Sequence, residues 1–302
     1  MQIYESLQGL GSDFGLALGV FDGVHLGHQA VIAEARLGSG RVGVLTFHPH
    51  PVQILAPQKA RRRILTSLPH QQHLMAKMGV DFMVVVPFTK KRAAQEAADF
   101  AAELFASGVR RVAVGEDWLF GRKRQGNLQK LQTWGAEKEV EVRGVAAVAA
   151  DGVRISSTRI RTALDHDDFA GARRLLGRNF SVLGHVEKGR QLGRQLGFAT
   201  ANVVAGEEYL PPDGVHAVRG DWGAGWRIGV SNVGRRPTIE PGGRRLLEVH
   251  FLDADDVPDL YGREIEVAFV EKIREEQKFA SLKELKNQIA ADAERARTIL
   301  QI

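Results

Sequence analysis

The sequence predicts an α/β protein, in which a Rossmann-like N-terminal domain with a parallel sheet precedes a six-stranded antiparallel β-barrel and a terminal helix. Three observations predict this fold class. The first 150 residues alternate apolar strand-like runs with helical patterns across short connections. After residue 180, six short strand patterns follow one another without helices and are separated by Gly, Pro and Asp turns. From Ser281 onward, a capping pattern precedes apolar residues at helical spacing.

The elements of the first half follow from the period of their apolar residues. The run at 80–88 is apolar and rich in β-branched residues, which predicts a strand buried in the middle of the sheet. The same reasoning predicts strands at 16–21, 43–47, 80–88, 111–117 and 140–148, and helices at 28–37, 68–79, 93–108 and 127–138.

The second half has a different pattern. Strands are predicted at 181–189, 201–204, 214–222, 226–234, 246–253 and 264–273. Ser281 with Glu284 three positions later is typical of a helix start, and the apolar stripe from Leu282 to Leu300 is predicted to pack on the core. The change of pattern indicates two domains, residues 1–180 and residues 181–302.

Composition excludes several classes of protein. With 44% hydrophobic and 25% charged residues, the 302-residue chain has an ordinary globular composition, and no run of eighteen apolar residues predicts a membrane span. The absence of cysteine excludes disulfides, thiolate metal sites and a cysteine nucleophile. Because the N-terminus also carries no signal pattern, we expect a cytoplasmic protein. The net charge of +5 suits a polyanionic partner without separating nucleotides from nucleic acid.

The stretch GVFDGVHLGH (19–28) lies where the first strand is expected to end. Gly19 and Gly23 allow a ligand to approach the backbone, and a helix N-terminus there would attract an anion. His25 and His28 add hydrogen-bond donors. A plain turn, a phosphate site, or a metal site completed by histidines 48 and 50 are the alternatives. A phosphate site is favoured, because Asp22 is the only nearby carboxylate for a metal.

The stretch ISSTRIR (155–161) is a second candidate for binding phosphate. Its hydroxyl residues precede a predicted helix, so that one caps the helix while others can bond phosphate oxygens. Arg161 lies one turn further on. A cap followed by arginines is common, so the signal is weak by itself. Together with the first turn, it predicts the two sides of a phosphate clamp.

These motifs and four others, in order from about residue 15 to 295, resemble one family. GVFDGVHLGH and ISSTRIR resemble the adenylyltransferase module of the nucleotidyltransferase superfamily. The family with further similar motifs is the bacterial bifunctional riboflavin kinase/FAD synthetase family, through VGEDWLFGRKRQGN (114–127), GRQLGFATANV (193–203), LPPDGVHAV (210–218) and LEVHFLD (247–253).

The resemblance implies two reactions on one chain. The barrel would transfer the γ-phosphoryl group of ATP to the 5′-hydroxyl of riboflavin and give FMN. The N-terminal nucleotidyltransferase domain would join FMN to AMP and give FAD and pyrophosphate. The implied partners are ATP, riboflavin, FMN and Mg²⁺, with no nucleic acid and no membrane, and the chain is expected to be a monomer or a weak homo-oligomer.

For the adenylyltransferase, the resemblance implies catalytic roles for His28 and Arg161 on the departing pyrophosphate. Asp117 and Phe120 are expected to border the flavin or adenine pocket. The residues implied to bind the ATP phosphates are Gly19, Phe21, Asp22, Gly23, His25, His28, Ser157, Thr158 and Arg161.

For the kinase, the resemblance implies that Glu248 is the general base and that Thr200 and Asn202 bind Mg²⁺. Strand alternation supports the first role, since Glu248 then lies on the opposite face from its apolar neighbours in the sequence. The residues implied to contact the ATP phosphates are Gly189, Arg190, Gly193, Gly197, Thr200 and Asn202.

One departure from the family pattern leaves an alternative open. Ala199 stands where the family usually has proline, which loosens the loop. The alternative is a monofunctional FMN adenylyltransferase with a non-catalytic, flavin-binding barrel. A nucleic-acid-binding barrel is disfavoured, because the whole chain holds only three tyrosines and four tryptophans for stacking bases.

Overall fold

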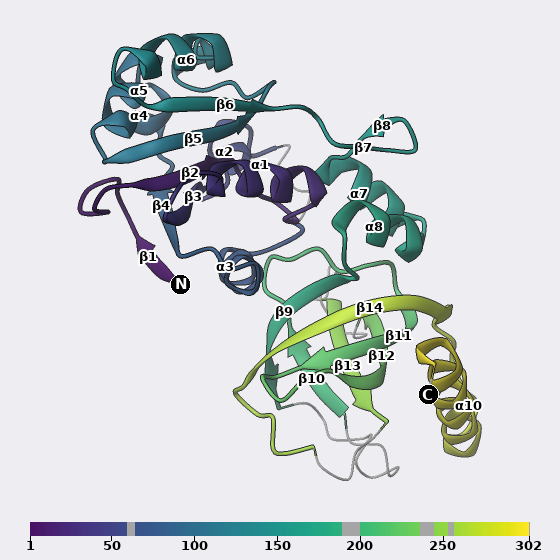
Figure 1. The fold of residues 1–302 in the computed structure, drawn as a ribbon. Coiled ribbons are helices and arrows are strands. Elements are labelled where there is room, and N and C mark those ends of the chain that lie inside the picture. Colours follow the sequence, from purple (N-terminus) through teal and green to yellow (C-terminus); the bar gives the residue numbers. More distant parts are fainter. Residues whose placement is uncertain (59–63, 189–199, 236–244, 253–256, 302) are drawn as a thin grey trace. The chain divides into compact units, whose positions relative to one another are not determined.

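The structure, a computed structural model, describes residues 1–58, 64–188, 200–235, 245–252 and 257–301 (Figure 1). The chain divides into two compact units, Met1–Arg63 with Leu68–Ser156, and Ile64–Ser67 with Ser157–Ile302. The segment from 157 to 180 therefore groups with the barrel by its contacts. A functional boundary after residue 180 stays a prediction.

The first unit is built on a six-stranded sheet in the order β1-β4-β3-β2-β5-β6, and every neighbouring pair is parallel. This confirms the predicted parallel α/β class. Its strands are β1 (Gln2–Tyr4), β2 (Phe14–Leu18), β3 (Arg41–His48), β4 (Phe82–Pro87), β5 (Val109–Gly115) and β6 (Glu141–Val145), with a separate hairpin of β7 (Ala149–Ala150) and β8 (Val153–Arg154). Its helices are α1 (Leu26–Arg36), α2 (Pro51–Leu55), α3 (Leu68–Lys77), α4 (Lys90–Ala93), α5 (Ala97–Phe105), the 3₁₀ turn η1 (Arg122–Arg124) and α6 (Leu128–Ala136).

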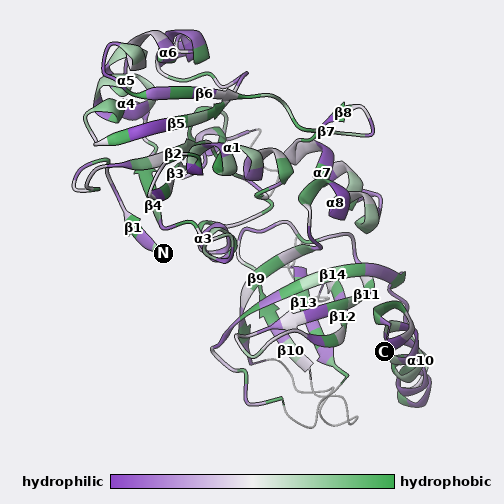
Figure 2. Ribbon diagram, viewed as in Figure 1, coloured by the Kyte–Doolittle hydropathy of each residue, from purple (hydrophilic) through white to green (hydrophobic). Residues whose placement is uncertain are grey.

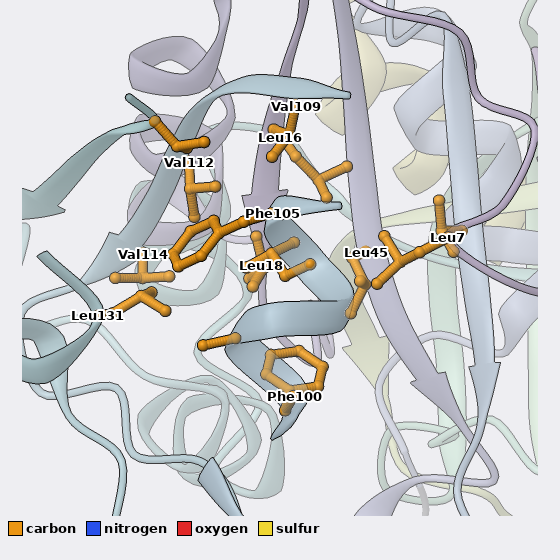
Figure 3. Close-up of a cluster of buried hydrophobic side chains, with 14 of the residues drawn as sticks. Leu7, Leu16, Leu18, Leu45, Phe100, Phe105, Val109, Val112, Val114 and Leu131 are labelled. Atoms are coloured by element: carbon orange, nitrogen blue, oxygen red, sulfur yellow. The ribbon is translucent and has the colours of Figure 1, made fainter. Parts of the chain in front are cut away.

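The core of this unit lies on both faces of the sheet. Leu16 and Leu18 of β2 belong to a cluster with Phe100 and Leu131, from α5 and α6 (Figure 3). Ala17, between them, belongs to a second cluster that includes residues of α1 and α3. Successive side chains of a strand point to opposite faces, so helices cover β2 on both sides and all five of its residues are buried. This is the environment of a central parallel strand.

The second unit is a closed barrel in the order β10-β13-β12-β11-β14-β9, and its pairs are antiparallel. The predicted six-stranded barrel with a terminal helix is confirmed. The strands are β9 (Phe180–Glu187), β10 (Thr200–Val204), β11 (Gly214–Asp221), β12 (Arg227–Arg235), β13 (Arg245–Phe251) and β14 (Glu264–Arg274). The helices are α7 (Ser157–Asp165), α8 (Phe169–Leu176) and α10 (Leu282–Leu300).

Helix α10 begins where the capping pattern predicts. The Ser281 hydroxyl accepts a hydrogen bond from the amide of Glu284 at 3.2 Å, and the Glu284 carboxylate accepts one from the amide of Ala280 at 3.1 Å. The helix carries both hydrophobic and hydrophilic positions (Figure 2). Leu300 is buried, but Leu282 is 70% exposed, so the predicted apolar stripe is wrong at the first turn. The helix is held to β14 by the Asp292–Arg274 ion pair at 2.7 Å.

His216, on β11, is a titratable group sealed inside the second unit. It has no exposed surface, and neither ring nitrogen makes a hydrogen bond of normal geometry within the described part of the chain. Phe169 and Phe269 meet its ring edge-on, with centroids 5.5 and 5.4 Å away. Burial, together with the charges of Lys272 and Arg245, lowers the pKa of His216 to about 4, against weaker opposing effects from the backbone of Gly214 and from Glu275.

This burial predicts a loss of stability in acid. An unfolded histidine has a pKa of about 6.5, so the folded state binds fewer protons, and stability is lost as the pH falls from about 6.5 to about 4. The full loss amounts to about 3 kcal/mol. We expect His216→Phe to remove most of this dependence. The free energy of unfolding in urea is measured for the parent and for His216→Phe at pH 7.5 and pH 5. An equal fall in this free energy between the two pH values in both proteins would contradict the assignment to His216.

Candidate active site

The turn between β2 and α1 lies at the carboxyl end of a central parallel strand, where open α/β sheets bind ligands. Its backbone is strained, because Phe21 and Val24 have φ of 56° and 44°, a region that residues other than glycine avoid. Packing explains the glycine at position 19, because a Cβ there would lie only 3.2 Å from the Phe21 ring. Strained backbone of this kind concentrates at functional sites.

The two histidines of this turn are held together at the start of α1. His25 is the N-cap, and its Nδ1 accepts the amide hydrogen of His28 at 3.3 Å. The two rings are stacked, with centroids 3.6 Å apart and planes 14° apart. A ring nitrogen that accepts a hydrogen bond carries no proton, so a neutral His25 keeps its hydrogen on Nε2 and can donate it. Asp22, beside them in the sequence, is buried.

The other two histidines of the metal alternative lie at the end of the neighbouring strand and just beyond it. His48 ends β3, which pairs with β2. His50 caps α2, where its Nδ1 accepts the amide hydrogen of Val52 at 3.1 Å and its amide donates to Gln53 at 3.0 Å. His50 therefore has a structural task as a helix cap.

The ISSTRIR motif forms the start of α7, so Ser157 and Thr158 occupy the first helical turn and Arg161 the second. Backbone N–H groups in a first turn lack helical partners and are suited to phosphate oxygens. These residues belong to the second unit, whereas His25 and His28 belong to the first. The predicted clamp therefore combines residues of two units and stays a prediction.

The predicted pocket residues Asp117 and Phe120 follow β5. Asp117 forms an ion pair with Arg154 at 2.6 Å, and this hydrogen bond lowers the pKa of Asp117. Phe120 is buried and stacks on Trp118, with centroids 4.6 Å apart. Gly126 is required beneath this ring, since a Cβ would come within 2.7 Å of it. The role of these residues in a pocket stays a prediction.

Barrel register brings the predicted kinase residues onto one face. Asn202 of β10 lies directly opposite Glu248 of β13, and Thr200 lies opposite His250. Directly opposite residues in an antiparallel pair share a face, with Cβ atoms about 5 Å apart. Leu247, next to Glu248, is buried, as alternation predicts, while Glu248 is half-buried.

The sequence analysis missed two neighbours of this site. Asn232 of β12 lies opposite Glu248, and its side-chain amide donates to the Glu276 carboxylate at 3.0 Å. Gly234 leaves room for that carboxylate, because a Cβ would lie 2.0 Å from it. No local pattern could identify this group, since it depends on how three strands pair. Gly189, Arg190, Gly193 and Gly197, expected near the kinase phosphates, lie outside the described residues.

Comparisons with known proteins match both units. The FAD synthetase family profile matches residues 11–159, and the riboflavin kinase profile matches residues 176–300. A bifunctional riboflavin kinase/FMN adenylyltransferase of Escherichia coli K12 is 43% identical over 290 residues, covering 93% of this chain and 91% of the relative.

The chain belongs to the bifunctional riboflavin kinase/FMN adenylyltransferase family.

Relatives from other bacteria agree. Family members from Pseudomonas fluorescens and Listeria monocytogenes are 40% and 36% identical, each across 93% of this chain and 91% of its own. A crystal structure from Streptococcus pneumoniae, described as a macrolide-efflux protein, is 28% identical with a TM-score of 0.83 over 98% of both chains. Within the described residues, this chain has no helix that is both long and apolar enough to cross a bilayer.

Proposed function

We propose that the first unit together with α7 makes FAD, and that the barrel makes FMN. The chain is a bifunctional enzyme, which phosphorylates riboflavin with ATP and adenylylates FMN with ATP. This assignment of one reaction to each part of the chain is supported by the two family profiles, which cover different parts of it. The second profile, with bifunctional relatives over the whole length, favours two activities over a monofunctional adenylyltransferase.

In FAD formation, a phosphate oxygen of FMN attacks the α-phosphorus of ATP, and the bond to the departing pyrophosphate breaks. The strained turn and the stacked histidines support a role for His25 and His28 in binding the phosphates. His28 would stabilise the charge on pyrophosphate. Ser157, Thr158 and Arg161 would bind the triphosphate from α7. Orientation alone can supply about 7–11 kcal/mol of such a barrier.

In FMN formation, Glu248 would take the proton of the riboflavin 5′-hydroxyl as its oxygen attacks the γ-phosphorus of ATP. The placement of Asn202 directly opposite Glu248 supports this role, because it joins a carboxylate to neutral oxygen ligands on one face. Thr200 and Asn202 offer hydroxyl and amide oxygens, which fit Mg²⁺. When bound, Mg²⁺ neutralises charge on the ATP phosphates. Glu276, which accepts a hydrogen bond from Asn232, places a second carboxylate beside this face.

Because both reactions consume ATP, we place the enzyme in the cytoplasm. We propose that it acts on small molecules as a monomer or a weak homo-oligomer, and that it binds neither nucleic acid nor a membrane.

The test of the double activity is direct. The purified protein is incubated with riboflavin, ATP and Mg²⁺, and the flavins are separated by chromatography. We expect FMN to appear first and FAD to follow. If supplied FMN became FAD while riboflavin stayed unchanged, the barrel would be a non-catalytic flavin-binding domain.

A further inference from the structure

We propose that Tyr209 and Lys272, two residues of the barrel unit, are positioning residues for FAD formation, because they anchor the helix that carries Ser157, Thr158 and Arg161. The inference rests on the proposed role of those α7 residues in binding ATP. Helices α7 and α8 pack on each other, and α8 packs on β9 and β14. The contacts described below connect this helical hairpin to the barrel at three successive points.

The first anchor holds the end of α7. The Tyr209 hydroxyl donates a hydrogen bond to the carboxylate of Asp165, the last residue of α7, at 2.5 Å. Burial and this bond raise the pKa of Tyr209 well above its usual value, so the phenol remains a donor at neutral pH. Asp165 lies four residues after Arg161, on the same face of the helix. Holding Asp165 therefore limits the rotation of the helix that presents Arg161.

Tyr209 is itself held by its neighbours. Its backbone amide donates to the Ile64 carbonyl at 2.7 Å. The adjacent Glu208 is fully buried, and its carboxylate accepts hydrogen bonds from the Ser67 hydroxyl at 2.6 Å and from the Leu183 amide at 2.9 Å. Charge-assisted hydrogen bonds from several donors hold a buried carboxylate, and the backbone next to it, in one position. Tyr209 therefore extends from a rigid part of the unit.

The second anchor holds the turn between the helices. Lys272 of β14 contacts Asp167 at 2.8 Å and Glu275 at 2.7 Å. The Lys272 side chain is only 12% exposed, so this pair is less weakened by water than a surface ion pair. Burial by itself would lower the pKa of Lys272, but the hydrogen bonds that it donates to Asp167 and Glu275 raise that pKa overall. Asp167 has a φ of 58°, a strained conformation that the surrounding contacts must maintain.

The third anchor is apolar and lies at the start of α8. Phe169 stacks nearly parallel on Phe269 of β14, with centroids 6.1 Å apart, and its ring also meets His216. Asp168 caps α8 by accepting the Gly171 amide hydrogen at 2.7 Å. The apolar contact holds α8 in place, and the two polar anchors fix the end of α7 and the turn that follows it. Misplacing a substrate-positioning group by about 1 Å can cost about 10²-fold in rate.

The experiment compares Tyr209→Phe, Lys272→Met and the double variant with the parent enzyme in both reactions. For FMN adenylylation, we expect the KM for ATP to rise and kcat to fall. Together these changes should lower kcat/KM for ATP by about tenfold in each single variant and by about 10²-fold in the double variant. The KM for FMN and the rate of riboflavin phosphorylation should stay within about twofold of the parent. Lys272→Arg, which keeps the positive charge and the donor groups, should retain more FMN adenylylation than Lys272→Met. Lys283→Met, at an exposed lysine of α10, is the matched control.

Two outcomes would overturn the anchoring. One is unchanged adenylylation in the folded double variant, and the other is an equal fall in both reactions, which would indicate general destabilisation. Arg161→Met separates this failure from a failure of the proposed function. If Arg161→Met leaves FAD formation intact, the role of the α7 motif is wrong. If it stops FAD formation while the double variant is normal, only the anchoring is wrong.

Discussion

Replacing Glu248 with glutamine is expected to slow riboflavin phosphorylation by about 10²- to 10⁴-fold, while supplied FMN is still converted to FAD. Glutamine keeps the size of the side chain and one acceptor oxygen, but an amide cannot take the hydroxyl proton. Glu248 lies opposite Asn202 on one side and Asn232 on the other, so the substitution changes charge within an otherwise intact face. Chromatography of the flavins, with riboflavin or FMN supplied separately, measures each reaction.

The matched control is Glu264→Gln, at an exposed carboxylate that begins β14. We expect it to leave both activities near those of the parent. Normal FMN formation in Glu248→Gln would exclude Glu248 as the general base. A parallel loss of FAD formation from supplied FMN would mean that the two reactions are not independent.

Replacing His28 with alanine is expected to abolish FAD formation, a loss of at least about 10²-fold, with FMN formation largely intact. The reason is the loss of the hydrogen-bond donor that we propose for the departing pyrophosphate. Alanine also removes the ring that stacks on His25, so packing changes at the same time. His28→Phe separates the two effects, because it keeps an aromatic ring and has no donor. We expect His28→Phe to lose FAD formation as well.

His185→Ala, at an exposed histidine of β9, controls for the removal of an imidazole elsewhere. Both FMN adenylylation and riboflavin phosphorylation are measured for each variant, with thermal unfolding as the check on folding. Retention of FAD formation by a well-folded His28→Phe would show that ring packing, rather than hydrogen-bond donation, is the task of His28.

Local patterns predicted most elements but not their details. Strand β1 was not predicted, because Gln2–Tyr4 is short and carries little apolar signal, and it forms only by pairing with β4. The helix predicted over 93–108 begins only at Ala97, as α5, while the short helix α4 ends at Ala93, where the prediction began. There, the Gln95 carbonyl accepts the Arg122 amide hydrogen at 2.7 Å in place of a helical bond. The strand at 80–88 is interior, but it lies next to the edge strand rather than at the centre.

The sequence by itself determined the two fold classes, the turn that places His25 and His28 at a helix start, and the face of β13 that carries Glu248. These features depend on residues a few positions apart, through periodicity, glycine and capping. Only the tertiary structure decided that Asn202 and Asn232 flank Glu248, and that α7 belongs with the barrel through Tyr209 and Lys272. Those contacts join residues far apart in the chain, and barrel closure sets their register, which no local pattern encodes.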